Sequence, residues 1–200
     1  MREILLKYLP EASLPLVLKW FEKHKFHLKI AKSRRTKLGD FRPINSRHPH
    51  RISVNGDLNP YHFLITLTHE VAHLIVWDKH QNRIQPHGKE WQTAYGNLLK
   101  KVIELVPFPK EVEAQIIQHI ARPKASSCSD PQLYKCLKKY DESSEKLTYL
   151  EELNEGDIFS LQNIRIFKRG KKKRSRFECL DQQNGKTYLI SGHASVKVLS

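Results

Sequence analysis

Long apolar runs and paired cysteines are both missing from the sequence, and each absence excludes a class of protein. No window approaches about 18 uninterrupted apolar residues, so we expect no membrane-spanning helix. Charged residues interrupt the apolar N-terminal segment and no small-residue cleavage site follows it, which indicates amphipathic helices and not a signal peptide. The three cysteines (Cys128, Cys136 and Cys179) form no CxxC pair and suit free thiols in a reducing cytoplasm better than a disulfide framework.

Acidic residues are also in short supply. The 200 residues include 35 Lys and Arg but 21 Asp and Glu, so the net charge is +14, and both halves of the chain are basic. A basic balance of this size favours a polyanionic partner, with nucleic acid the leading candidate. The alternative is that the charge serves solubility alone.

Residues 1–122 combine the patterns of helices and strands. Alternating apolar residues predict short strands, and longer amphipathic segments with start signals predict helices. We expect an α+β domain with a small three-stranded antiparallel sheet (strands at 26–31, 37–42 and 50–55; helices at 2–9, 12–24, 60–77, 86–105 and 109–121).

The rest of the chain has a different texture. Residues 123–149 are polar and rich in Ser and Lys, which predicts a linker with room for one helical turn. Residues 150–200 contain five short strand-like runs separated by turn signals such as Asn184-Gly185. Five strands in so short a segment predict a small closed β-barrel, SH3-like in type.

The motif with the clearest chemistry is HEVAH, which begins at His69. Residues four apart lie on one helix face, so His69 and His73 can bind one metal ion. Zinc accepts imidazole nitrogens in tetrahedral geometry, and a catalytic zinc site leaves one position to water. Glu70 can then act as the general base. The start signals Asn59 and Pro60 and the apolar residues around the pair favour a buried metal helix over two histidines on an exposed face.

The spacing does not fix the third ligand. In the metzincin pattern a histidine follows ten residues after the first, but that position is Lys79, and we interpret His80 as a surface histidine. Glu90 could complete a gluzincin-type site, and His87 is the other candidate. His87 and Glu90 are three residues apart and share a helix face, so geometry alone does not separate them.

The combination of HEVAHLIVW and QPHGKEW resembles the SprT-like zinc metalloproteases, which include the Spartan-type DNA–protein crosslink proteases. The upstream segments LKIAKSRRTKLGDFRP and RISVNGDLNP resemble that family's sheet, so the resemblance covers roughly residues 10–120. It implies a zincin-like domain with one catalytic Zn²⁺ bound by His69, His73 and His87. It also implies that Glu70 is the general base and that Glu90 supports the ligands or packs the helix.

The sequence departs from the family downstream of this domain. Many members carry a zinc ribbon built from paired cysteines, but the three cysteines of this chain cannot supply four ligands. We therefore expect no structural zinc in the C-terminal part. Contacts with DNA must come from elsewhere or be absent.

Two basic clusters are candidates for nucleic-acid binding. One lies in a predicted hairpin and has seven basic residues in nine (Lys168, Arg169, Lys171, Lys172, Lys173, Arg174 and Arg176). The other lies near the predicted sheet (Arg34, Arg35 and Lys37, with Arg42, Arg47, Arg51 and Phe41). Each phosphate contact would make binding more sensitive to salt. A solvated charged hairpin without a partner is equally compatible with the first cluster.

The sequence predicts a cytoplasmic, monomeric zinc metalloendopeptidase that can associate with the nucleoid. The resemblance implies that its substrates are DNA-bound or DNA-crosslinked proteins. One alternative is a DNA-independent peptidase. The other is a nucleic-acid-binding module with a structural or vestigial zinc site, although an intact Glu70 counts against it. Tyr61 and Tyr95 are both candidates for stabilising the oxyanion of peptide hydrolysis. We expect Trp77 and Trp91 to be core residues.

Overall fold

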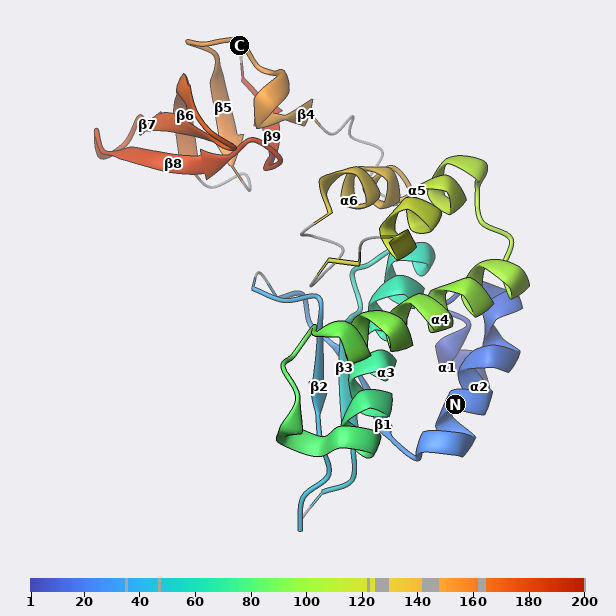
Figure 1. Ribbon diagram of the computed structural model, residues 1–200. Helices are drawn as coiled ribbons and strands as arrows, with labels where there is room; N and C mark the ends of the chain where they lie inside the picture. The colour runs from blue at the N-terminus through green and yellow to red at the C-terminus, as the bar shows by residue number, and fades with distance from the viewer. Residues whose placement is uncertain are drawn as a thin grey trace. The chain divides into compact units, whose positions relative to one another are not determined.

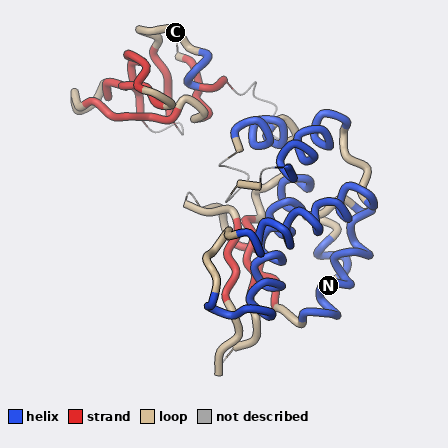
Figure 2. The backbone as a smooth tube through the Cα atoms, viewed as in Figure 1, coloured by secondary structure: helices blue, strands red, loops and turns tan. Residues whose placement is uncertain are grey.

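The computed structural model describes residues 1–34, 36–46, 48–121, 123–124, 130–141, 148–161 and 165–199. The chain forms two compact units, Met1–Glu142 and Ser143–Ser200 (Figure 1). The first unit combines helices with a small sheet, and the second is built mainly of strands (Figure 2). Among the described residues, no helix is both long enough and apolar enough to cross a membrane.

The helices of the first unit form close to their expected places, with differences at their ends. The segment predicted as a helix over 2–9 is helical for one turn, and the segment over 12–24 begins with a 3₁₀ turn. Pro15 occupies the first turn of the second helix, where a missing N–H is tolerated. The helices are α1 (Arg2–Leu5), η1 (Glu11–Ser13), α2 (Leu14–His24), α3 (Pro60–His80), η2 (Gln81–Arg83), α4 (Lys89–Leu105), α5 (Lys110–Ala121) and α6 (Pro131–Lys138).

The sheet of the first unit has three strands, as expected, but it is mixed and not antiparallel. Its order is β1 (His27–Ala31), β3 (Arg51–Asn55) and β2 (Gly39–Arg42). β3 pairs antiparallel with β2 and parallel with β1. Alternation predicts which face of a strand is buried, but it carries no information on the direction of the neighbouring strand. The expectation of an all-antiparallel sheet was therefore wrong.

The longest helix, α3, is the centre of the first unit. Its start is fixed as the sequence predicts, because the Asn59 side chain accepts a hydrogen bond from the His62 N–H at 3.0 Å. The helix runs past the expected end at Trp77 to His80, where Gln81 turns the chain with a φ of 52°. α4 and the strands β2 and β3 pack against it. Twelve of its residues are buried, including His69 and Glu70.

Helix α6 lies within the segment that we expected to be a linker, 123–149. Its apolar residues Leu133, Cys136 and Leu137 share one face and are buried. Asn59 also donates to the Leu137 carbonyl at 2.7 Å, so the cap of α3 and the end of α6 are joined. The first unit thus extends beyond the expected boundary at residue 122. The helix was missed because it is short and lies in a polar segment. Cys128 lies outside the described residues.

The second unit contains a six-stranded antiparallel sheet in the order β4-β9-β5-β6-β7-β8. The five expected strands all form, and β4 is added within the expected linker. Their bounds are β4 (Thr148–Tyr149), β5 (Ile158–Leu161), β6 (Arg165–Lys173), β7 (Arg176–Asp181), β8 (Thr187–Ser191) and β9 (Ser195–Val198), with η4 (Leu150–Glu152). A core of its own includes Phe159, Phe167 and Phe177. β4 and β8 stand at the two ends of the strand order, so closure into an SH3-like barrel stays a prediction.

Candidate metal centre

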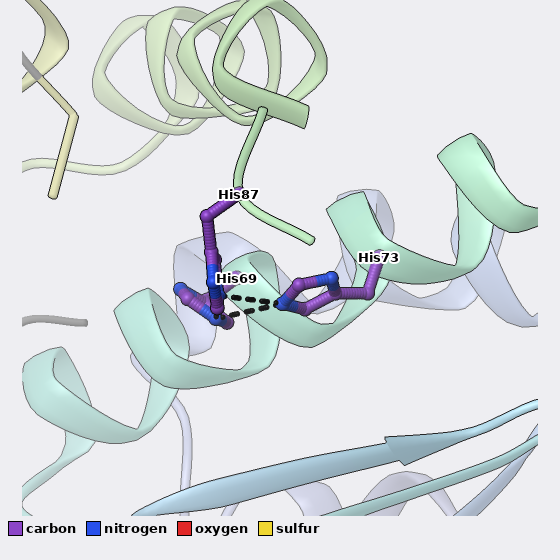
Figure 3. A group of neighbouring side chains, drawn as sticks. All are labelled: His69, His73 and His87. Carbon is purple, nitrogen blue, oxygen red and sulfur yellow. Dashed lines mark hydrogen bonds between the residues drawn. The ribbon is translucent and has the colours of Figure 1, made fainter. Parts of the chain in front are cut away.

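Three histidines of the first unit turn their ring nitrogens toward one point (Figure 3). His69 and His73 come from successive turns of α3, and His87 comes from the loop before α4. The Nε2 atom of His73 lies 3.0 Å from that of His69 and 3.0 Å from that of His87, and the third separation is 3.3 Å. Three neutral imidazoles have few protons to share in such a triangle, so a cation between them explains it better.

The size of the triangle fits a metal ion such as zinc. Zinc binds imidazole nitrogen at about 2.0–2.1 Å, and in tetrahedral geometry this places two such nitrogens about 3.3 Å apart. The observed separations of 3.0, 3.0 and 3.3 Å are close to that value. The cluster His69–His73–His87 could therefore bind a metal ion, and it is the one group of such side chains found among the described residues.

Burial keeps these imidazoles uncharged, which is the form that binds metals. For His69, burial and then the neighbouring rings of His73 and His87 lower the pKa to about 2. For His73, burial and then the neighbouring His87 lower the pKa to about 4. Burial also lowers the pKa of His87. At neutral pH the three rings are therefore available as ligands without first losing a proton.

The position of His87 depends on an unusual backbone conformation. His87 has a φ of 60°, in the left-handed region that most residues avoid. It stands between Pro86 and Gly88, and the Gln92 side chain donates to its carbonyl at 3.1 Å. Strained residues of this kind often occur where a side chain must be aimed at a functional site. Here the strain directs a loop histidine at the two helical ones.

Trp91 forms a wall shared by all three histidines. Its ring lies 4.6 Å from His69, 5.3 Å from His73 and 4.7 Å from His87, measured between ring centroids. The side chain is buried, as the sequence predicted for a core residue. The sequence did not predict its contact with the cluster, although its position one helical turn after His87 was a usable signal.

Glu70 lies on a different side of α3, against the edge strand β2. The Phe41 N–H donates a hydrogen bond to its carboxylate. A Cβ built on Gly39 would lie 2.8 Å from Cγ of Glu70, so only glycine leaves room for this side chain. Burial, and then the charge of Asp40, raise the pKa of Glu70 to about 8 against the opposing effect of nearby Arg34 and Lys37.

The two candidates for the third ligand that the spacing left open lie in different surroundings. His87 joins the pair on α3, whereas Glu90 is exposed. Glu90 lines a groove between α3 and α4 together with Lys79 and His80. His80, expected to be a surface histidine, takes no part in the cluster.

Neither tyrosine proposed for the oxyanion is placed to contact a substrate carbonyl at the cluster. The Tyr95 hydroxyl is buried, and its ring packs edge-on against His69 with 5.4 Å between centroids. Tyr61 precedes His69 by eight residues, which corresponds to about 12 Å along a helix. It packs instead against Phe108 and Tyr140.

The basic cluster near the sheet is largely engaged within the first unit. Arg34 donates to Asn55 Oδ1 at 2.8 Å and to Ser53 Oγ at 2.9 Å, so its guanidinium ties the loop after β1 to β3. Lys37 forms an ion pair with Asp40 at 2.7 Å. These contacts occupy donors of Arg34 and Lys37, and phosphate binding by the two side chains stays a prediction. Arg35 and Arg47 lie outside the described residues.

The other basic cluster follows the β6–β7 hairpin, as the sequence predicted. Arg169 is partly buried and stacks on Phe177 at 4.2 Å. A register shift next to Arg169 brings Gly170 so close to β7 that an added Cβ would lie 2.7 Å from the Glu178 carbonyl oxygen. The other basic side chains of the cluster are exposed (Lys168, Lys171, Lys172, Lys173, Arg174 and Arg176).

The fold and the site together define an α+β domain with a three-histidine cluster that could bind a metal ion. Residues 15–113 match the SprT-like family, and through this domain the chain belongs to that family. The match includes the three histidines and Glu70 but ends before the last turns of α5, so the second unit lies outside it.

Curated relatives carry the same family name. The chain is 39% identical over 67 residues to Protein SprT of Escherichia coli (strain K12), which covers 32% of this chain and 37% of the relative. It is 50% identical over 50 residues to Protein SprT of Pseudomonas fluorescens (strain SBW25), which covers 24% of this chain and 28% of the relative. The chain thus matches about a third of the length of these relatives. No solved structure matches the chain significantly.

Proposed function

We propose that the protein is a zinc-dependent metalloendopeptidase. The observation that carries this proposal is the triangle of Nε2 atoms of His69, His73 and His87, with separations of 3.0 to 3.3 Å, next to a buried Glu70. When bound by these three imidazoles, zinc would polarise a peptide carbonyl and lower the pKa of a water molecule. A site of this kind with three protein ligands keeps a position open for the reaction.

In this proposal Glu70 is the general base. A cation bound by the three histidines would favour its ionised form against the raised pKa of about 8. The ionised carboxylate then removes a proton from the attacking water and passes it to the leaving amine of the cleaved peptide. Its carboxylate is held by the Phe41 N–H and is enclosed by Gly39, so the side chain has little freedom to turn away. A nucleic-acid-binding module with a structural zinc site would have no use for such a residue.

The edge strand β2 is the proposed binding surface for the substrate. β2 lies at one end of the sheet order, and its residues Gly39 and Phe41 contact Glu70. An extended peptide can add to such an edge through main-chain hydrogen bonds. Main-chain pairing would bring peptide bonds to Glu70 with little dependence on side chains, so we expect broad sequence specificity.

The experiment that tests this function compares the wild-type chain with Glu70→Gln. With single-stranded DNA added, we expect the wild type to cleave a basic DNA-binding protein, and the variant to lose at least about 100-fold of that rate, the lower end of what general-base catalysis contributes. Both proteins should hold one zinc ion per chain, because Gln keeps the shape of the side chain. A Glu70→Gln variant with undiminished peptidase activity would refute the catalytic assignment.

We further propose that the substrate is a protein bound or crosslinked to DNA. Support comes from the net charge of +14 and from the exposed basic side chains of the β6–β7 hairpin. DNA would then bring protease and substrate together, which suits a site without a demanding side-chain pocket. Cleavage that requires added single-stranded DNA and weakens with salt is the expected result.

Two competing functions predict different outcomes of the same assay. A DNA-independent peptidase would cleave equally well with and without DNA. A nucleic-acid-binding module would bind zinc and DNA but cleave nothing under either condition.

The buried free thiols of Cys136 and Cys179 are in keeping with the proposed cytoplasmic location.

A further inference from the structure

A group of buried polar side chains begins next to His69 and extends from α4 to the start of α6. Tyr95 of α4 packs against His119 of α5 with 5.8 Å between ring centroids, and His119 contacts Asp130 at the start of α6. His119 and Asp130 lie outside the part of the chain that matches the SprT-like family, 15–113. We call Tyr95, His119 and Asp130 the polar column.

Asp130 fixes the orientation of the His119 ring. The His119 Nδ1 atom lies 2.7 Å from Asp130 Oδ2, and the His119 side chain has no exposed surface. Burial raises the pKa of Asp130, but hydrogen bonds from His119 and from the Leu133 N–H outweigh it and hold the pKa below its usual value. An ionised carboxylate accepts, so Nδ1 carries a proton, and in the neutral ring Nε2 is left as an acceptor.

Two buried polar atoms of the column have no partner in the described part of the chain, and they are complementary. One is the His119 Nε2 atom, and the other is the Tyr95 hydroxyl, which can donate or accept. Buried polar atoms almost always have a partner, directly or through an ordered water, and exceptions call for an explanation. The two rings that carry these atoms meet edge-on, with an angle of 82° between their planes.

Tyr95 in turn contacts the candidate metal ligands. Its ring meets His69 edge-on, with 5.4 Å between centroids, and stacks on Trp91 at 4.8 Å. Trp91 contacts all three histidines of the cluster. A shift of the Tyr95 ring would therefore move the surfaces against which the three imidazoles rest.

We propose that His119, held by Asp130, is a positioning residue for the three-histidine cluster. One buried water joins the Tyr95 hydroxyl to His119 Nε2, and this fixes the rings of Tyr95 and Trp91 behind His69. The column thereby orients the ligands for metal binding without touching the metal or the substrate. This inference rests on the metal site of the proposed function.

A purely structural role for His119 predicts a different result. As an ordinary core histidine between α5 and α6, it would stabilise the fold, but the folded protein would bind metal equally well without it. The two roles separate when zinc affinity is measured on folded protein, apart from the stability of the metal-free chain.

The test is a double-mutant cycle on the zinc dissociation constant of the full chain, measured by competition with a chelator. Tyr95→Phe removes only the hydroxyl and keeps the ring, so it leaves the fold intact, and His119→Phe removes the acceptor. Supporting groups near a metal ligand affect affinity by about 10- to 100-fold, and we expect about 10-fold for each variant. The double variant should lose no more affinity than the weaker-binding single variant, because both changes break one link.

Controls separate the failure of this inference from the failure of the metal site. Gln118→Ala changes an exposed residue of the same helix and should leave zinc affinity unchanged. With cobalt in place of zinc, Tyr95→Phe should also alter the visible absorption spectrum, which reports ligand geometry. Unchanged zinc affinity in Tyr95→Phe, or fully additive effects in the double variant, would overturn the positioning role alone. A wild-type chain that binds no zinc would overturn both proposals.

Discussion

The two units of the chain use polar side chains in opposite ways. In the first unit, the polar groups with the clearest chemistry are buried, and burial sets their state: His69 and His73 stay uncharged and Glu70 holds a raised pKa. In the second unit the basic side chains of the β6–β7 hairpin are mostly exposed, and the described residues of this unit include a core of seven buried side chains. The energy of a buried polar group depends on the exact positions of its partners. Exposed charges act together through the electrostatic potential that they add up to.

The largest effect is expected from the small core of the second unit. Phe177→Ala removes a buried ring that packs with Phe167 and Cys179, and its removal should cost about 3–5 kcal/mol. A unit with so small a core is not stable enough to tolerate this loss of free energy. We therefore expect the second unit to unfold while zinc remains bound to the first. Circular dichroism with parallel zinc analysis measures both. A matching loss of zinc would show that the two cores are not independent.

Removal of the third histidine should abolish tight metal binding. Removing a group that merely supports a ligand costs about 10- to 100-fold in affinity, so His87→Ala should cost more than about 100-fold and end any peptidase activity. His80→Ala is the matched control, because this nearby histidine lies outside the cluster. Equal zinc affinities of the two variants would show that His87 is not a ligand.

A single methyl group next to Glu70 should separate catalysis from metal binding. In Gly39→Ala the new Cβ would meet Cγ of Glu70 at 2.8 Å, which should destabilise the fold by about 1–3 kcal/mol and lower peptidase activity with zinc retained. Gly96→Ala, where the nearest atom is 3.8 Å away, should be tolerated. Similar thermal stability and activity of the two variants would disprove the close approach of β2 to Glu70.

The smallest effect should come from the exposed charges. Replacement of Lys171 and Lys172 by Gln should weaken DNA binding a few-fold. It should also make the slope of log affinity against log salt concentration shallower, by up to about 0.9 for each phosphate that is no longer neutralised. Replacement of Lys100 and Lys101 of α4 by Gln removes the same charge from the first unit. DNA titrations at several salt concentrations distinguish the two explanations. A local effect of the hairpin would weaken DNA binding only in the Lys171 and Lys172 variant, whereas a general effect of net charge would weaken it equally in both double variants.

Local signals in the sequence predicted most elements of both units. Asn59 and Pro60 marked the start of α3, and alternation marked the strands, because capping and burial are decided by a few adjacent residues. The parallel pairing of β1 with β3 could not be predicted from such local signals. It arises because the chain forms β2 on the far side of β3 before it returns to pair β3 with β1. Helix α6 was not predicted, because its burial comes from contacts with residues distant in sequence, among them Asn59.

The candidate site shows the same division between local and distant information. The spacing of His69 and His73 placed two rings on one helix face, whereas His87 could be preferred to Glu90 only through resemblance to a family. Arg34 looked like a phosphate ligand by its charge, but its donors bind Ser53 and Asn55 within the fold. No local pattern marks the contact of Tyr95 with His119, because α4 and α5 supply one ring each.

The loop position of His87 couples metal binding to the completeness of the tertiary structure. Two of the proposed ligands, His69 and His73, belong to one helix and could assemble in a fragment. The third, His87, reaches them only when residues 81–88 have folded back and α4 has packed against α3. A metal ion bound to all three histidines would hold this loop against α3. At a free concentration of a hundred times the dissociation constant, the ion would add about 2.7 kcal/mol to the free energy of unfolding. Chelation should therefore loosen 81–88 first, and amide hydrogen exchange in that loop would follow metal occupancy.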